Sequence, residues 1–173
     1  MNAVTYAALF LRAALGITMI AHGWNHAFRG GKLAGTARWF DSIGIKPGKL
    51  HALLATVTEL GSGTLLLLGF LTPLAAAGVV GTMLVALIAN HIRNGFFIFR
   101  PGEGYEYVLF IVLSGFAMGA LGGGKISLDH AFKLHLHGWL YGGKGLAVTA
   151  IGAVGALALL AACWRPPTRE KAS

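Results

Sequence analysis

Long apolar stretches constrain the fold of this chain more than any other feature of its sequence. Five of them reach the roughly 17 to 25 residues that a helix needs to cross a bilayer. They are Thr5–Phe28, His51–Leu71, Thr72–Ile92, Tyr105–Gly122 and Gly145–Cys163. Charged residues make up only 12% of the chain, against roughly 25% in soluble domains. The sequence therefore predicts an all-α membrane protein, with a four-helix transmembrane bundle core and a fifth, C-terminal transmembrane helix.

The junctions between these stretches indicate how they are arranged. The second passes directly into the third at Thr72-Pro73, and proline fits the first turn of a new helix, so these two must form an antiparallel hairpin. No Lys or Arg precedes the first stretch and no small-residue cleavage site follows it, which predicts a retained helix rather than a signal peptide. We expect residues 1–173 to form a single membrane domain ending in a polar tail, 164–173.

Glycine is frequent inside the apolar stretches, for example at Gly61 and Gly63 and in the spacing Gly115-x-x-x-Gly119. Small residues let membrane helices approach closely. We therefore expect tight helix packing, with a specific dimer face as the alternative.

The connection between the first two stretches, Arg29–Leu50, mixes apolar and charged residues. Trp39 and Phe40 are interleaved with Lys32 and Arg38. This pattern predicts a short amphipathic helix that lies at the membrane interface.

The basic excess, a formal net charge of +8, does not indicate nucleic-acid binding, because the charges lie in short segments between apolar runs. One side of the membrane receives Arg29, Lys32, Arg38, Lys46, Lys49, Arg93, Arg100, Arg165, Arg169 and Lys171, and the other receives Lys125, Lys133 and Lys144. The positive-inside rule then predicts a multi-pass protein of the cell membrane, with its N-terminus outside and its C-terminus in the cytoplasm.

Polar and ionisable residues gather at one end of the predicted bundle. Since successive helices alternate in direction, the end of the first helix meets the start of the second, the end of the third and the start of the fourth. That end receives His22, His26, His51, Asn90, His91, Glu103 and Glu106. The opposite end receives little that is ionisable from these helices except the segment Lys125–Asp129. This one-sided distribution of polar and ionisable residues indicates a functional site at that end of the bundle.

Two further charges, Arg12 and Glu59, lie deeper in the predicted helices. Arg12 precedes His22 by ten residues and Glu59 follows His51 by eight, or roughly 15 and 12 Å along the helix. A lone charge at this depth costs on the order of 2.5–3.5 kcal/mol, so each should seek a partner inside the bundle. We expect Arg12 and Glu59 to pair. The pair would either fix the helix register or serve as a proton relay or ligand contact.

Metal and thiol chemistry have weak support. His22 and His26 share a helix face and, with nearby imidazoles and carboxylates, could bind a metal, but the spacing is common and no fuller motif accompanies it. We expect neither a metal nor a bis-histidine haem. Cys163, the single cysteine, is expected to be an inert apolar residue, and His135 and His137 to be loop histidines.

Several short motifs, in order along the chain, resemble the DoxX family of small membrane proteins. They are Arg12 with Gly16; His22-Gly23; Glu59-Leu-Gly-x-Gly with the Leu65–Gly69 run and Thr72-Pro73; Asn94-Gly-Phe-Phe97; Gly104-Tyr-Glu106; and Gly122-Gly-Gly-x-x-Ser127-Leu-Asp129. The resemblance implies a four-helix membrane core and an association with redox physiology, including quinone-linked sulfur oxidation and partnership with soluble redox enzymes. The fifth helix and residues 130–144 extend past this shared core.

The leading functional hypothesis is a subunit of a membrane redox system, an oxidoreductase component whose pocket binds a small molecule such as a quinone. Its head group would bind to His22, Asn90, His91 or Glu106, while Arg12 and Glu59 would exchange or stabilise protons. The alternative is a non-enzymatic scaffold or assembly factor that recruits a soluble redox enzyme through the segment Arg29–Leu50. A transporter is disfavoured because the opposite end of the bundle carries few ionisable groups. No hydrolase or dinucleotide-binding motif appears.

Overall fold

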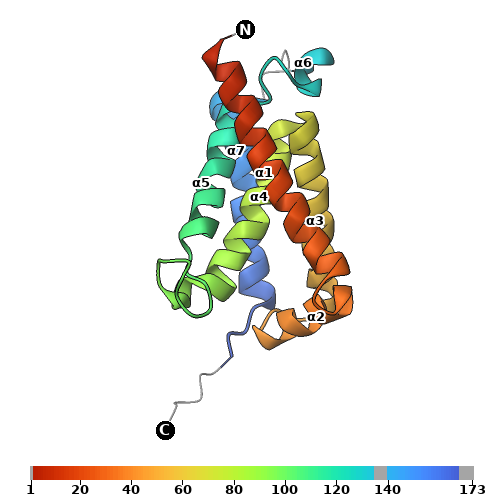
Figure 1. Ribbon diagram of the computed structural model, residues 1–173, viewed down its shortest axis with the longest axis vertical. Helices are drawn as coiled ribbons and strands as arrows, with labels where there is room; N and C mark the ends of the chain where they lie inside the picture. The colour runs from red at the N-terminus through yellow and green to blue at the C-terminus, as the bar shows by residue number, and fades with distance from the viewer. Residues whose placement is uncertain (1, 135–139, 168–173) are drawn as a thin grey trace.

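The chain folds into an elongated helical bundle, for which a computed structural model describes residues 2–134 and 140–167. The helices are α1 (Ala3–Phe28), α2 (Lys32–Ser42), α3 (Gly48–Leu68), α4 (Thr72–Ala86), α5 (Glu106–Leu121), α6 (Leu128–Ala131) and α7 (Gly142–Cys163). The five longest run along the bundle, α2 lies across one end, and α6 lies at the other end (Figure 1).

Within the described residues, four helices are long and apolar enough to cross a membrane: α1, α3, α7 and the continuous helical segment Thr72–Asn94 that begins with α4. The all-helical fold is therefore confirmed, and the C-terminal helix is one of the four candidate spans. The expected crossing at Tyr105–Gly122 is not confirmed. Its helix, α5, is apolar but has 16 residues, about 24 Å, against a hydrocarbon core of about 30 Å.

The expected hairpin of α3 and α4 is confirmed. Gly69 ends α3 in the left-handed conformation with φ +63°, and Pro73 lies in the first turn of α4. The α4 N-terminus is capped from far along the chain. Both backbone N–H groups at Leu71 and Thr72, and the Thr72 hydroxyl, donate to the buried carboxylate of Asp129 at 2.6–3.0 Å. This carboxylate satisfies helix-end donors that have no partner within the helix.

Glycines bring the helix backbones together, as expected. A Cβ added to Gly16 of α1 would lie 2.8 Å from the Gly63 carbonyl oxygen of α3, and a Cβ added to Gly63 would lie 2.8 Å from the Gly16 carbonyl oxygen. On α7, a Cβ at Gly152 would collide with the backbone of Ala77 in α4. These contacts fix the register of α1 on α3 and of α7 on α4.

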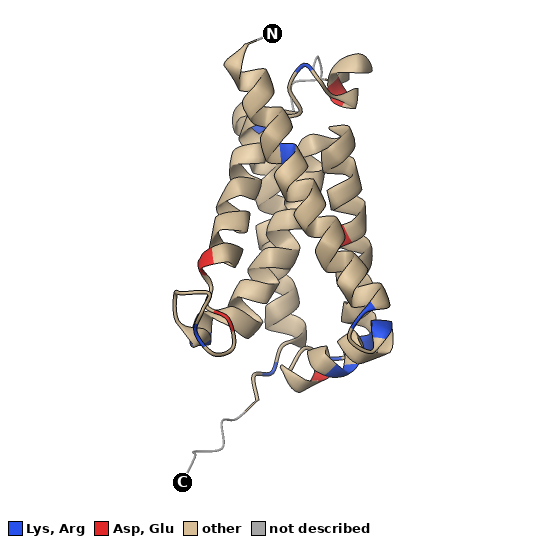
Figure 2. Cartoon of the chain, viewed as in Figure 1, with Lys and Arg blue, Asp and Glu red and all other residues tan. Residues whose placement is uncertain are grey.

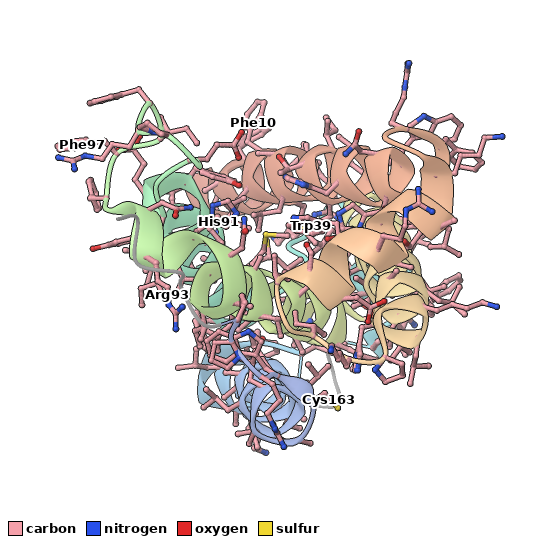
Figure 3. All side chains as sticks on the ribbon, turned by 90° about the horizontal axis from the view of Figure 1, so that it is seen from below. Phe10, Trp39, His91, Arg93, Phe97 and Cys163 are labelled. Atoms are coloured by element: carbon pink, nitrogen blue, oxygen red, sulfur yellow. The ribbon has the colours of Figure 1, made fainter. Side chains whose placement is uncertain are left out.

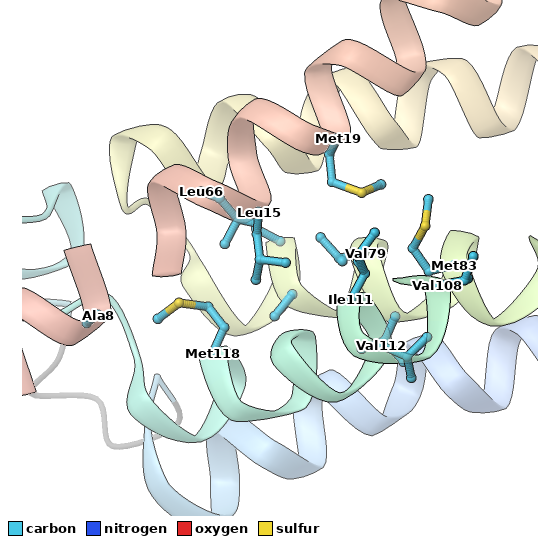
Figure 4. Close-up of a cluster of buried hydrophobic side chains, with 13 residues drawn as sticks. Ala8, Leu15, Met19, Leu66, Val79, Met83, Val108, Ile111, Val112 and Met118 are labelled. Carbon is cyan, nitrogen blue, oxygen red and sulfur yellow. The ribbon is translucent and has the colours of Figure 1, made fainter. Parts of the chain in front are cut away.

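The apolar core lies among α1, α3, α4 and α5 (Figure 4). Met19 of α1 and Leu66 of α3 are fully buried there. Met83 of α4 and Val108 of α5 belong to the same core and also line a cavity near the α2 end of the bundle. The packed core therefore forms the inner wall of that cavity.

The helix α2 closes the end of the bundle through its apolar side. Phe40 and Ala37 pack with Ile45 and Ala52, and the Thr36 hydroxyl donates to the His26 carbonyl at 3.0 Å. The C-terminal end of α7 braces the α2–α3 connection, since the Trp164 indole N–H donates to the Ile43 carbonyl at 3.0 Å. An amphipathic helix thus lies in the expected segment, 29–50. Its position at a membrane interface stays a prediction.

Lys and Arg residues gather at this same end of the bundle, in and around α2 and in the loop before α5 (Figure 2). Arg29 to Lys49 lie in or beside α2 in the sequence, and Arg93 and Arg100 precede α5, whereas Lys125 lies in the connection after α5 and Lys144 in the first turn of α7. Arg169 and Lys171 fall outside the described residues.

Candidate functional site

A cavity of about 380 Å³ lies beneath α2, between the end of α1, the middle of α3, the end of the α4 segment and the start of α5. Its polar lining residues are His22, Asn25, His26, Arg29, Thr36, Glu59, Asn90, His91, Glu103 and Tyr107. Its apolar walls include Trp39, Phe40 and Met83. Viewed from this end, His91 and Trp39 lie towards the middle of the bundle, whereas Cys163 lies at its edge (Figure 3). The cavity is within the range of roughly 300–1,000 Å³ that small-molecule sites occupy.

A close contact in the cavity wall joins the imidazole of His26 in α1 to the carboxyl group of Glu59 in α3. Nδ1 of His26 lies 3.4 Å from Oε2 of Glu59, and the two side chains are 16% and 5% exposed. Neither atom has a partner in hydrogen-bond geometry. Since an unpaired buried polar group costs about 1–3 kcal/mol, these two atoms retain an unused capacity for hydrogen bonding.

His91 is held by three neighbours. Its Nδ1 lies 3.0 Å from the Glu103 carbonyl oxygen, which can only accept, so Nδ1 carries the proton. Its Nε2 then accepts from the Tyr107 hydroxyl at 3.0 Å and from the Asn90 amide at 3.2 Å. This histidine is fully satisfied within the protein. It therefore orients Tyr107 and Asn90 at the cavity, rather than offering a ring nitrogen to a ligand.

A π-helical turn, η1 (Leu87–His91), places Asn90 and His91 at the cavity. The Ile92 N–H donates to the Leu87 carbonyl, five residues back, and a 3₁₀ turn, η2 (Ile92–Asn94), follows. Such a widened turn rotates the side chains that follow it relative to an α-helix, and π turns are frequent at functional sites.

His22 stands one helical turn before His26 and is half-buried in the cavity lining. Among the described residues it has no hydrogen-bond partner, so its ring can donate to or accept from a bound molecule. The same region holds the Asn25 amide and the Arg29 guanidinium at the cavity mouth.

The expected pairing of Arg12 with Glu59 is wrong. Arg12 donates through Nη2 to the Ile126 carbonyl and interacts electrostatically with Asp129, at the opposite end of the bundle. Its guanidinium packs against Gly69, which stands ten residues, or about 15 Å, along α3 from Glu59. The contact between Gly16 and Gly63 sets this register, which places Glu59 beside Gly23 and His26 instead.

Two other residues of the expected cluster lie outside this cavity. Glu106 accepts a hydrogen bond from the Ile98 N–H at 3.0 Å, within the loop before α5. His51 lines a different cavity, on the far side of Phe40 and Ile45. Glu103 does line the cavity, but its hydrogen bonds are made by its backbone, through the carbonyl oxygen and the N–H group.

The metal hypothesis receives no geometric support from the part of the chain that the structure describes, where no three His, Cys, Asp or Glu residues form a group that could hold an ion. His135 and His137 lie outside the described residues. Cys163 is a half-buried free cysteine at the end of α7, and its backbone carbonyl accepts from the Lys46 N–H.

Sequence reasoning missed Tyr107, and it named Asp129 only as part of a family motif without its role in capping α4. Tyr107 follows Glu106 by one position, and only the hydrogen bond to His91 distinguishes it from an ordinary interfacial aromatic residue. Asp129 carried a signal that could have been used: it is the one carboxylate between α5 and α7, in a segment that must return to the end of the bundle where α4 begins.

Residues 7–92 match the sequence profile of the DoxX family, which confirms the resemblance noted in the sequence. The match covers α1 to α4, and with them most of the cavity lining. Comparisons with curated proteins and with solved structures returned no match.

Proposed function

The chain belongs to the DoxX family through residues 7–92, and from this premise we propose that it is a quinone-binding subunit of a membrane redox system. One observation carries the proposal. Glu59 Oε2 and His26 Nδ1 lie 3.4 Å apart in the wall of an intramembrane cavity, and neither has a hydrogen-bond partner. Ionisable groups inside a membrane bundle are costly and mark ligand or proton sites.

The cavity suits a flat, uncharged head group with carbonyl oxygens. Trp39, Phe40 and Met83 supply apolar walls, and His22 and Asn90 supply N–H donors. The Asn90 amide gives one hydrogen to His91 and has a second available. This combination of apolar walls with a few directed polar groups is typical of small-molecule sites.

A bound quinone supplies two-electron chemistry, in which its two carbonyl oxygens take up two protons as it becomes a quinol. We propose that the electrons come from a soluble redox enzyme. Within this chain, Glu59 and His26 hold exchangeable protons at the cavity wall. Tyr107 is held in place by its hydrogen bond to His91, so its hydroxyl is preorganised beside the same space.

The proposed topology places the α2 end of the bundle in the cytoplasm of the cell, with α5 completing a fifth crossing beside α4 and α7. The basic residues around α2 support this orientation. They also give the soluble enzyme a positively charged surface next to the cavity mouth, where Arg29 lies.

Quinone titration tests the proposal directly. The full chain in lipid nanodiscs is titrated with a decyl-substituted benzoquinone, with the fluorescence of Trp39 and the other tryptophans as readout. Glu59→Leu should weaken binding by about tenfold, equivalent to about 1.4 kcal/mol, because the carboxyl group that can donate its O–H to a quinone carbonyl oxygen is lost. Lys125→Gln, at the opposite end, is the control and should leave the affinity unchanged. Absence of saturable binding, or an affinity in both Glu59→Leu and His26→Leu equal to that of the unchanged protein, would exclude a quinone site here.

The scaffold function remains the competing proposal, supported by the basic surface around α2. A cellular redox assay separates the two. If Glu59→Gln retains full activity while neutralising Lys32, Arg38 and Lys49 abolishes it, the chain recruits a partner and the cavity is not used.

A further inference from the structure

A groove runs between α3 and α7, with α4 as its floor. Its two sections are cavities of about 250 and 400 Å³, and Thr58 lines both. The first section lies between Leu54 and Ala55 of α3 and Gly155 and Leu159 of α7. The second continues past Gly61 and Leu65 of α3 to Ile151 and Gly152 of α7. The groove thus follows α4 along much of the bundle.

Small residues make the groove deep. Gly78 and Gly81 lie on its floor, and Gly61 and Gly155 lie on its two sides. A Cβ added at Gly61 or Gly155 would have no neighbouring atom within 4 Å, so space is open at both positions. Among the residues that the structure describes, no Lys, Arg, Asp or Glu lines either section. A charged head group would find no permanently charged counter-ion there, which favours a neutral ligand over a phosphate or a carboxylate.

His51 lines the end of the groove nearest α2. Only 6% of it is exposed, and both ring nitrogens are buried without a hydrogen-bond partner. The contrast with His91, whose nitrogens are both satisfied, shows that the fold can provide partners for a buried imidazole. A turn of the His51 ring towards the cavity would break no hydrogen bond, because the ring makes none. A hydroxyl group is a suitable partner, since it can donate to or accept from a neutral imidazole.

We propose that this groove binds a single-chain neutral lipid whose terminal hydroxyl bonds to His51 and whose hydrocarbon chain lies along α4. A transmembrane helix of a partner is a poor occupant, because a helix is about 10–12 Å wide and the section that His51 lines has a volume of only about 250 Å³. The groove is separate from the cavity beneath α2, and the wall between them contains Phe40, Ile45, Ala55 and Val85.

Photolabelling tests the proposal on the full chain in nanodiscs. The probe is hexadecanol carrying a diazirine near the end of its chain, and labelled peptides are identified by mass spectrometry. Labelling should be saturable, competed by unlabelled hexadecanol, and concentrated in α3, α4 and α7. The carboxylic acid of the same chain length should compete poorly.

Variants separate a groove site from general contact with lipid. His51→Leu should lower the saturable labelling about fivefold, as expected for the loss of one hydrogen bond. Gly155→Phe should abolish it by filling the groove, and because its Cβ meets open space it provides the test if His51→Leu fails to fold. Gly143→Phe is the matched control on α7, also open at Cβ and outside the groove lining.

Labelling that does not saturate, that survives both His51→Leu and Gly155→Phe, or that decyl benzoquinone displaces more strongly than hexadecanol would overturn the proposal. The first two results would leave ordinary lipid contact, and the third would assign the groove to a quinone. The quinone titration tests only the cavity beneath α2, and the photolabelling tests only the groove. Either proposal can therefore be disproved while the other stands.

Discussion

Nδ1 of His26 lies 3.4 Å from Oε2 of Glu59, and this contact joins the last turns of α1 to the middle of α3 at the wall of the cavity. Burying either side chain without the other is unfavourable in free energy, because the buried group loses its hydration. The neighbouring side chain offsets part of that cost. The two residues should therefore act as a unit in stability as well as in ligand binding.

This coupling can be measured with a double-mutant cycle of His26→Gln and Glu59→Gln, followed by unfolding in detergent. We expect an interaction free energy of about 1 kcal/mol, in the range typical of residues in direct contact. His26→Gln with Asp129→Asn, at opposite ends of the bundle, should be additive within about 0.5 kcal/mol. Additivity in both cycles would show that the 3.4 Å contact contributes nothing to the free energy of unfolding.

The cap on α4 gives a second prediction. Asp129→Asn replaces one of the two carboxylate oxygens that accept from Leu71 and Thr72 with an amide that can only donate. The free energy of unfolding should fall by about 1.5–3 kcal/mol, because the lost bonds are to a buried charge. Glu103→Gln, an exposed carboxylate, should change it by less than about 0.5 kcal/mol. Thermal unfolding followed by circular dichroism measures both, and equal transitions would contradict the role of Asp129.

The helices and the one-sided cluster were predictable because they depend on features that sequence displays directly. Apolar length locates the spans, and alternating helix direction brings His22, His26, Asn90 and His91 to one end whatever the details of packing. The turn at Thr72-Pro73 was also predictable, because proline fits the first turn of a helix. The short α5 was overestimated, because Tyr105 and Gly122 are apolar enough to extend the stretch although they lie outside the helix.

Residue-level pairing was not predictable, because it depends on helix register and rotation. The register of α1 on α3 comes from the approach of Gly16 to Gly63, one of many glycine pairs that the sequence would allow. That choice separates Arg12 from Glu59. His51 and Glu59 are eight residues apart, which at about 100° per residue leaves them about 80° apart around α3, so they face different cavities. The π-helical turn at Leu87–His91 has no comparable sequence signature.

The α1–α3 contact makes a third prediction. Gly63→Ala should lower the free energy of unfolding by about 1–3 kcal/mol, because the added methyl lies 2.8 Å from the Gly16 carbonyl oxygen and neither backbone can move easily. Gly61→Ala, two residues earlier on the same helix, meets nothing within 4 Å and should cost nothing measurable. Equal stability of the two variants in the same detergent would show that close approach at Gly63 does not hold α1 on α3.

Orientation in the membrane provides the last prediction. The two ends of the bundle differ in charge, and the candidate site lies beneath α2, at the more basic end. In a chain whose single cysteine is removed by Cys163→Ala, cysteines are introduced separately at Arg38 and Lys125, in α2 and in the connection after α5. A membrane-impermeant maleimide should label intact cells at Lys125→Cys, whereas Arg38→Cys should react only after the membrane is opened. The reverse pattern would place α2 outside and remove the cytoplasmic enzyme from the proposed function. Labelling of both in intact cells would contradict a bundle that spans the membrane with α2 and α6 at opposite faces.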